Sequence, residues 1–232
     1  METPVLRQML FIVLSTGSSL IATAQSPAVA NLVAKASATQ PHVKLGRVVY
    51  EKRCKSCHGA TAWGDGSEDV PSLAGQRELY LVTQLAQFAT QERNGSTMHE
   101  ATSTADVNNP QSIRDLAAYL SRAPANPHPK HKDADETAAA SGESLFQRNC
   151  AMCHGTAAQG SSEEPIPALA GQHYDYTLIQ LKSFARGHRG QVEAPVIDFT
   201  AGLSDEEQKG IADYLSRLKL RYFFRRPPAL LH

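Results

Sequence analysis

Residues 54–58 have the sequence CKSCH, and residues 150–154 have the sequence CAMCH. The two segments lie 96 residues apart and contain all four cysteines of the 232-residue chain. In each, two thiols are separated by two residues and a histidine follows at once. Because the pattern C-x-x-C-H occurs twice and leaves no cysteine over, it is far more specific than one occurrence would be.

This pattern is typical of the attachment of a c-type haem. Two sulfurs at this spacing can add across the vinyl groups of the porphyrin, and the adjacent imidazole is then within reach of the iron. Paired cysteines also form disulfides in exported chains, act as redox pairs or bind zinc, which is the main alternative. None of these alternatives explains why a histidine directly follows both pairs. We therefore predict two covalently bound haem c groups.

The sequence around the motifs repeats as well, so the chain is an internal duplication. A glycine and an aromatic residue precede each motif at the same spacing, Gly46 with Tyr50 and Gly142 with Phe146. Residues four apart lie on one face of a helix. A glycine on that face lets another helix approach closely.

Each half continues with helical patterns, and neither shows strand-like alternation of any length. The matching loops VPSLAGQ and IPALAGQ precede the first of these helices. The predicted helices are 78–90 and 113–122 in the first half and 174–185 and 211–217 in the second. Ser204 with Glu207 forms a capping box at the start of the last one. The predicted fold class is all-α.

The N-terminus has the features of a secretory signal peptide rather than of a retained membrane anchor. Arg7 precedes an apolar stretch, residues 9–21, that is short for a membrane span, and residues 22–24 (ATA) form a small-x-small cleavage site. Cleavage after Ala30 is the alternative. The predicted organisation is a signal peptide at 1–24, domains at 43–122 and 142–219, an exposed Pro-rich linker at 123–141 and a C-terminal extension at 220–232.

The order of helix, C-x-x-C-H, proline-containing loop, helix, methionine-bearing loop and closing helix resembles a class I cytochrome c domain. Two fused copies behind a signal peptide resemble the periplasmic dihaem cytochrome c4 group, particularly in the LAGQ segments and in the LAAYLS and IADYLS closing helices. The resemblance covers about residues 43–219. It implies two tandem class I cytochrome c domains that transfer single electrons between redox partners in the periplasm and transform no substrate.

The resemblance also assigns residues by position. It implies thioethers at Cys54, Cys57, Cys150 and Cys153, proximal ligands at His58 and His154, and first helices packed on last helices at Gly46, Tyr50, Tyr119, Gly142, Phe146 and Tyr214. Pro71 and Pro167 match the family proline whose carbonyl accepts from the ligand's distal N–H. Met98 lies where the family places its axial methionine, in the loop before the last helix, with His99 as a weaker alternative. A thioether there raises the reduction potential.

The second half departs from this pattern because its matching loop, residues 189–199, contains no methionine. Alignment places either Ala194 or Glu193 opposite Met98. Met152 is held between the two cysteines of the second motif on the proximal side, so it cannot substitute.

Three states therefore stay open for the second iron: a histidine ligand, a five-coordinate iron, or a ligand borrowed from elsewhere. His188 lies closest in sequence to the missing position and is the first candidate, ahead of His173 and His232. A bis-histidine site would have a lower potential than the first site, so electrons would run from the second haem to the first.

The leading functional hypothesis is a periplasmic electron carrier between a dehydrogenase or quinol-oxidising complex and a terminal oxidase or reductase. The alternative is a haem enzyme or small-ligand sensor that uses an open or histidine-ligated second haem for peroxidase-like or gas-binding chemistry. A third hypothesis is peripheral association with a membrane complex, because residues 220–228 combine aromatics with three arginines. The formal net charge of zero argues against a nucleic-acid partner.

Overall fold

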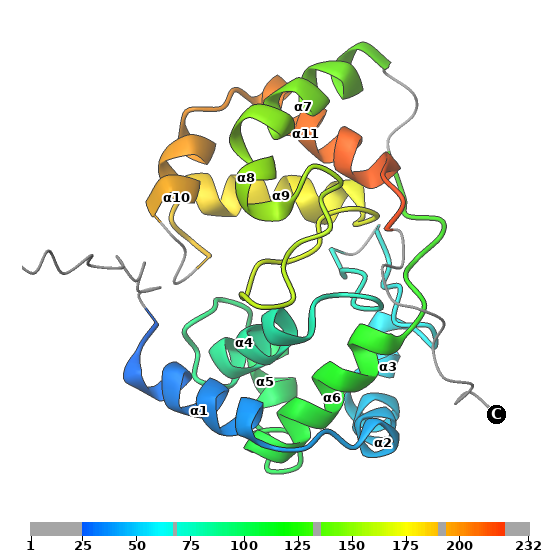
Figure 1. Ribbon diagram of the computed structural model, residues 1–232, viewed down its shortest axis with the longest axis vertical. Coiled ribbons are helices and arrows are strands. Elements are labelled where there is room, and N and C mark those ends of the chain that lie inside the picture. Colours follow the sequence, from blue (N-terminus) through cyan, green and yellow to red (C-terminus); the bar gives the residue numbers. More distant parts are fainter. Residues whose placement is uncertain (1–24, 67–68, 132–135, 190–193, 221–232) are drawn as a thin grey trace, which may run out of the picture.

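The computed structural model describes residues 25–66, 69–131, 136–189 and 194–220. Within these ranges all regular structure is helical, apart from an isolated bridge between Asp65 and Val70. The predicted all-α class is therefore confirmed. The helices form two bodies, one built from α1–α6 and the other from α7–α11, with a connector running between them (Figure 1).

The helices follow the same order in both halves. The first body contains α1 (Pro27–Ala38), α2 (Val43–Arg53), α3 (Lys55–His58), α4 (Glu78–Ala89), α5 (Ser96–Thr102) and α6 (Pro110–Arg122). The second contains α7 (Glu136–Asn149), α8 (Ala151–His154), α9 (Tyr174–Ala185), α10 (Ala194–Ala201) and α11 (Asp205–Arg217). Helices α2 to α6 correspond to α7 to α11, and the helices expected at 78–90, 113–122, 174–185 and 211–217 are all present.

The first and last long helices of each body cross in close contact, α2 on α6 and α7 on α11. A Cβ added at Gly46 would lie 2.0 Å from the carbonyl oxygen of Asp115, and one at Gly142 would lie 2.0 Å from that of Gly210. Aromatic rings meet beside each crossing, with centroids 5.6 Å apart in the first half and 5.7 Å apart in the second. The predicted role of the glycines is confirmed: only a residue without a side chain permits this approach.

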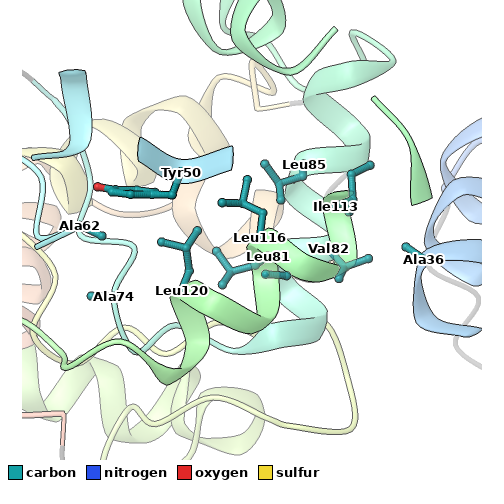
Figure 2. Packing of buried hydrophobic residues seen from close by; sticks show 11 residues of the cluster. Ala36, Tyr50, Ala62, Ala74, Leu81, Val82, Leu85, Ile113, Leu116 and Leu120 are labelled. Atoms are coloured by element: carbon teal, nitrogen blue, oxygen red, sulfur yellow. The ribbon is translucent and has the colours of Figure 1, made fainter. Parts of the chain in front are cut away.

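The core of the first body lies between α2, α4 and α6 (Figure 2). Ile113, Leu116 and Leu120 recur at helical spacing on α6 and bury their side chains against Leu81 and Leu85 of α4. An apolar stripe at this spacing is what fixes an amphipathic helix on its neighbours. The corresponding core of the second body joins α7 to α11 around Phe146, Ile211 and Leu215.

Helix α1 was not predicted and has no counterpart among the described residues of the second half. Ser26 caps it, since its hydroxyl accepts from the N–H of Val29, and Pro27 occupies the first turn. Val29 and Ala36 are completely buried against α4 and α6. The predicted signal peptide, residues 1–24, lies outside the described residues.

The expectation that Met98 lies in a loop is wrong. Met98 lies within α5, and residues 194–199 of the expected second loop are helical in α10. These short helices are hidden from sequence analysis because seven or eight residues hold too few periodic positions to be distinguished from a loop. By contrast, the capping box at Ser204 and Glu207 is confirmed at the start of α11.

The connector is only partly the exposed linker that its composition predicts. Most of residues 123–131 are exposed, but Asn126 is buried, and the N–H of Tyr174 donates to the carbonyl of Lys130 at 2.9 Å. Its last part is helical, because α7 begins at Glu136. The connector is held by the first body as well, because the indole N–H of Trp63 donates to the carbonyl of Pro124 at 2.9 Å and Lys130 pairs with Asp65 at 2.7 Å.

Candidate haem sites and the interface between them

The two C-x-x-C-H motifs adopt the same local structure. Each forms a single helical turn, α3 or α8, immediately after a longer helix. The first cysteine lies at the junction of the two helices and is partly buried, whereas the second is exposed. In both motifs the histidine N–H donates to the carbonyl of the first cysteine at 2.9 Å, which closes the turn. Each motif therefore presents two thiols and an imidazole from one short, fixed segment.

A proline carbonyl orients the imidazole of each motif. The Nδ1 atom of His58 lies 3.2 Å from the carbonyl oxygen of Pro71, and that of His154 lies 3.0 Å from the carbonyl oxygen of Pro167. Because a carbonyl can only accept, Nδ1 carries the proton and Nε2 keeps a free lone pair. The hydrogen bonds expected at the two prolines are present, and each histidine can offer Nε2 to an iron.

Sequence reasoning missed two glycines that bring these proline loops to the histidines. Gly64 and Gly160 have φ of +72° and +68°, and their N–H groups donate to the carbonyls of His58 and His154. A Cβ at Gly64 would lie 2.4 Å from the carbonyl oxygen of Pro71, and one at Gly160 would collide with the backbone of Pro167. The available signal was their separation of 96 residues, which is the separation of the haem motifs.

Burial sets the protonation of the donor groups. It lowers the pKa of both His58 and His154 below the ordinary value, with an opposing contribution from the proline carbonyl. The imidazoles are therefore neutral at neutral pH, as a metal ligand must be. Burial also raises the pKa of the Cys54 thiol to about 12 and that of Cys150 to about 11, assisted by the second cysteine of each motif.

Haem c fits this set of donors. Each motif offers two thiols that are not in disulfides and a neutral imidazole with Nε2 unengaged. In the described part of the chain, no group of three or more His, Cys, Asp or Glu residues is placed to hold a bare metal ion, so zinc has no ligand set there. When bound, the iron porphyrin supplies reversible one-electron chemistry.

Met98 lies half-buried in α5, next to His99. The Nδ1 atom of His99 lies 2.8 Å from the carbonyl oxygen of Phe88, so this helix offers two donors, the thioether of Met98 and the Nε2 atom of His99.

A sequence model of the cytochrome c family matches residues 43–124 and again residues 139–219. The chain belongs to the cytochrome c family. It is similar to cytochrome c4 from Thiocapsa roseopersicina, with 33% identity over 176 residues that cover 71% of this chain and 86% of the relative. It is also similar to the thiosulfate dehydrogenase electron acceptor of Thiomonas intermedia (strain K12), with 31% identity over 172 residues that cover 70% of this chain and 77% of the relative.

A solved structure supports the same assignment. Reduced cytochrome c4 from Pseudomonas stutzeri matches with a TM-score of 0.65 and 27% identity over 78% of this chain and all of that one. The protein is therefore a dihaem electron-transfer cytochrome with two tandem cytochrome c domains and covalently bound haem c, as predicted. The alternative of a haem enzyme or ligand sensor is not favoured by these relatives.

In this cytochrome, glutamines from the LAGQ segments join the two domains. The side-chain amide of Gln172 donates to the carbonyl of Ser72 and accepts from its N–H, at 3.0 and 2.9 Å. Gln76 makes the same pair with Ala168, at 3.0 and 2.7 Å. Ser72 and Ala168 directly follow the prolines that orient the histidines. Each glutamine therefore fixes the proline loop of the opposite domain.

A second symmetric contact of the cytochrome is built from arginines. Arg93 donates to the Tyr176 hydroxyl of the other domain at 3.0 Å, and Arg189 donates to the Tyr80 hydroxyl at 2.8 Å. Arg93 lies over the ring of Phe88 at 4.4 Å, and Arg189 over the corresponding ring in its own domain at 4.7 Å. Burial opposes ionisation of Tyr176, but the two guanidiniums outweigh it and lower its pKa.

The histidines proposed for the second iron are placed differently from one another. Both ring nitrogens of His173 are engaged, because Nδ1 accepts from the N–H of Lys130 at 2.9 Å and Nε2 donates to the carbonyl of Trp63 at 2.7 Å. His173 is therefore an interface residue and not a free ligand. His188 is exposed after α9, and its carbonyl accepts from the side chain of Asn94. His232 lies outside the described residues.

Proposed function

We propose that this cytochrome binds one haem in each of the units 43–122 and 142–219, joined by the connector 123–141. The proposed attachment residues are Cys54, Cys57, Cys150 and Cys153, the proximal ligands are His58 and His154, and their positioning residues are Pro71 and Pro167. Met98 is the proposed sixth ligand of the first haem. The observation that carries the proposal is the same arrangement found twice, with Nδ1 bound to a proline carbonyl and Nε2 free.

Haem stoichiometry tests the attachment residues. Replacement of both Cys150 and Cys153 by alanine should leave one haem per chain. The intact mass of the variant should show the loss of the other haem. The paired replacement of Cys54 and Cys57 is the matched control in the other half. Two haems in either variant would contradict the assignment.

Met98 is tested by the weak far-red absorption of the oxidised protein, which reports a methionine–iron bond. Met98→Val should abolish this band. His99→Ala is the matched control at the neighbouring position, and it should retain the band. Loss of the band in the histidine variant alone would reverse the assignment.

For the sixth position of the second haem, His188 is the candidate from sequence, and an open position is the alternative. Either state lacks a thioether, and axial ligands tune haem potentials over about 0.8 V. We therefore propose that the second haem has the lower potential and passes electrons to the first. A redox titration should resolve two steps, and the loss of Met98 should move the higher step only. A wild-type titration with two equal potentials would contradict this direction.

We propose redox proteins as partners, with a dehydrogenase or quinol-oxidising complex as donor and a terminal oxidase or reductase as acceptor. A relative named as a thiosulfate dehydrogenase electron acceptor supports a dehydrogenase as the donor. Rapid-mixing reduction by a thiosulfate dehydrogenase should be fast and salt-dependent. Reduction by a quinol-oxidising complex under the same conditions is the comparison that decides between the two donors.

We further propose export to the periplasm. The predicted signal peptide supports this location, and no helix in the described part of the chain is long and apolar enough to cross a membrane. The C-terminal extension, of which residues 221–232 lie outside the described residues, contributes three arginines and three aromatics. We propose that it docks to an acidic partner or the membrane face. Its deletion should slow partner reduction at low salt and leave both haem spectra unchanged, whereas unchanged kinetics would contradict docking.

A further inference from the structure

We propose that the outward face of α2 and α3 in the first domain docks an acidic redox protein, and that the matching face of the second domain does not. This inference rests on the proposed exchange of electrons with redox partners and names the domain on which one of them docks. The docking face consists of the exposed side chains of these two helices, Lys44, Leu45, Val48, Lys52, Lys55 and Ser56.

Helical spacing places these side chains on one surface. Lys44, Val48 and Lys55 follow one another at intervals of four and seven residues, so they lie along one line of the helix. Tyr50 lies on the opposite side, where it is buried against α6. Cys54 keeps a helical backbone between α2 and α3, so the line continues into the haem turn. The docking face is therefore one continuous surface about 16 Å long.

Two large apolar side chains protrude from the docking face. Leu45 is 54% exposed and Val48 is 59% exposed, and a separation of three residues makes them neighbours on the helix. In the described part of the chain, the other exposed large apolar side chains are Met152 and Ile179, which are distant from each other in sequence. Single apolar residues on a surface are ordinary. An adjacent pair with a polar surround is typical of the centre of an interface.

The surround of this apolar pair is positively charged. Lys44 and Lys55 are exposed and make no ion pair within the described residues. Two further cations beside them share a single carboxylate, so positive charge is in excess here although the whole chain is neutral. A positive surface steers an acidic partner toward it and fixes its orientation. The ion pairs at the docking face are Arg47 with Glu51 at 2.8 Å, Lys52 with Asp106 at 2.8 Å and Arg53 with Asp106 at 2.9 Å.

The matching face of the second domain has neither feature. With the offset of 96 residues set by the haem motifs, Leu45 and Val48 correspond to Ser141 and Ser144. Because α7 packs on α11 as α2 packs on α6, the fold itself does not require exposed aliphatic residues or excess cations here. The other corresponding pairs are Lys44 with Ala140, Arg47 with Glu143, Lys52 with Arg148, Lys55 with Ala151 and Ser56 with Met152.

The docking face reaches the attachment point of the first haem. Lys55 and Ser56 stand between the two proposed attachment cysteines. A partner seated on these residues is therefore only a few covalent bonds from the porphyrin. With the proposed direction of transfer, from the second haem to the first, the protein that docks here is the electron acceptor.

The test measures how fast an acidic blue-copper protein oxidises the fully reduced holoprotein in a stopped-flow instrument, at low and at high salt. Lys44→Glu places a negative charge on the docking face, and Arg148→Glu makes the same change of net charge on the matching helix of the second domain. Lys44→Glu should slow oxidation about fivefold at low salt, whereas Arg148→Glu should stay within about twofold of wild type. The difference should vanish at about 0.5 M salt, because the charges are then screened.

The apolar pair is tested by Leu45→Ser combined with Val48→Ser, which gives the first domain the residues of the second. Oxidation should slow about fivefold at both salt concentrations, because salt does not screen an apolar contact. Benzoquinone, a small neutral oxidant, is the control. It should oxidise every variant at the wild-type rate, since the haems are unchanged.

Three results would overturn the inference. One is oxidation by the blue-copper protein at the wild-type rate in both Lys44→Glu and the double serine variant. Another is equal slowing by Lys44→Glu and Arg148→Glu, because only net charge would then matter. The third is an unchanged oxidation rate in Lys44→Glu together with lost binding to anionic lipid vesicles or lost self-association, which would assign the face to a membrane or to a second copy.

Failure of the proposed function gives a different result. A wild type that benzoquinone oxidises but the blue-copper protein does not would refute the exchange of electrons with redox proteins, whichever residues are replaced. The direction of transfer is tested separately by the redox titration.

Discussion

Tyr50 and Phe146 hold equivalent positions beside the two haem motifs, but only Tyr50 carries a hydroxyl. That hydroxyl donates to the carbonyl of Gly59, at the end of the α3 turn, at 2.6 Å. The side chain is buried, and burial raises the pKa of Tyr50 well above its ordinary value, assisted by Cys54 and Tyr119. At the scale of single residues, the first haem turn therefore has a support that Phe146 cannot give the second, where the side chain of Gln147 donates to the carbonyl of Thr156 at 2.9 Å instead.

Tyr50→Phe should lower the free energy of unfolding of the holoprotein by about 1 kcal/mol at neutral pH, because one buried hydrogen bond is lost. Since the folded pKa is raised, the hydroxyl contributes fully below pH 10, the ordinary tyrosine value, and its contribution is lost as the pH rises toward the folded pKa. The difference between wild type and variant should shrink above pH 10. Denaturant unfolding from pH 7 to 11 measures it, and a constant difference would contradict the buried hydroxyl.

The resemblance to class I cytochrome c was enough to predict the bonds of His58 and His154 to proline carbonyls, because it matches Pro71 and Pro167 to the family proline. It was not enough for Gly64 and Gly160. Their importance depends on a left-handed backbone and on the approach of a loop, and neither property is visible in residue type alone.

At the scale of helices, the resemblance predicted that α2 packs on α6 and α7 on α11, whereas the glycine and aromatic at helical spacing predicted only that another helix approaches. Helix α1 was not predicted, because its Ala-rich sequence carries a weak apolar pattern and follows the predicted signal peptide. The burial of α1 depends on the apolar surface that α4 and α6 offer, and the sequence of α1 alone does not show that surface. Its first turn also bears on processing, because the two candidate cleavage sites lie on either side of it.

The mature protein should begin at Gln25. Cleavage after Ala24 keeps the Ser26 cap and the buried Val29 of α1, whereas cleavage after Ala30 would remove its whole first turn. N-terminal sequencing or intact mass of the exported protein decides this. A mature chain beginning at Asn31 would show that α1 is not part of the exported fold as described.

Gly46→Ala should lower the free energy of unfolding by about 3 kcal/mol or prevent maturation, because the added methyl group meets the backbone of α6 at 2.0 Å. Gly202→Ala is the matched control, since its Cβ would have its nearest neighbour at 3.5 Å. Denaturant unfolding followed by haem absorption gives both values. Equal effects of the two substitutions would contradict the close helix crossing.

At the scale of the whole molecule, the two domains are joined by contacts that repeat across a twofold-like interface. Gln76 and Gln172 each bind the backbone beside the opposite histidine-orienting proline, and Arg93 and Arg189 each reach a tyrosine of the other domain. Amides that serve as both donor and acceptor across an interface are costly to remove, because the backbone groups left behind lose their partners. The interface therefore fixes the two proline loops that orient His58 and His154 relative to each other.

Replacement of both Gln76 and Gln172 by alanine should weaken domain docking by about 1–3 kcal/mol for each residue. The haem spectra should be retained, and the radius of gyration measured by small-angle X-ray scattering should increase. Gln147→Ala, at an exposed glutamine within the second domain, is the control and should leave the radius unchanged. An unchanged radius in the double variant would show that other contacts suffice.

The sequence by itself determined the duplication, the all-α class and the two haem motifs. These features rest on local spacing and on residue chemistry, which a repeat displays twice. Only the tertiary structure decided that the LAGQ glutamines cross between domains, that His173 is an interface residue and that Met98 lies within a short helix. Such features depend on which segments distant in the sequence approach one another, and on helices too short to show a period in the sequence. Spacing along the chain does not encode either directly.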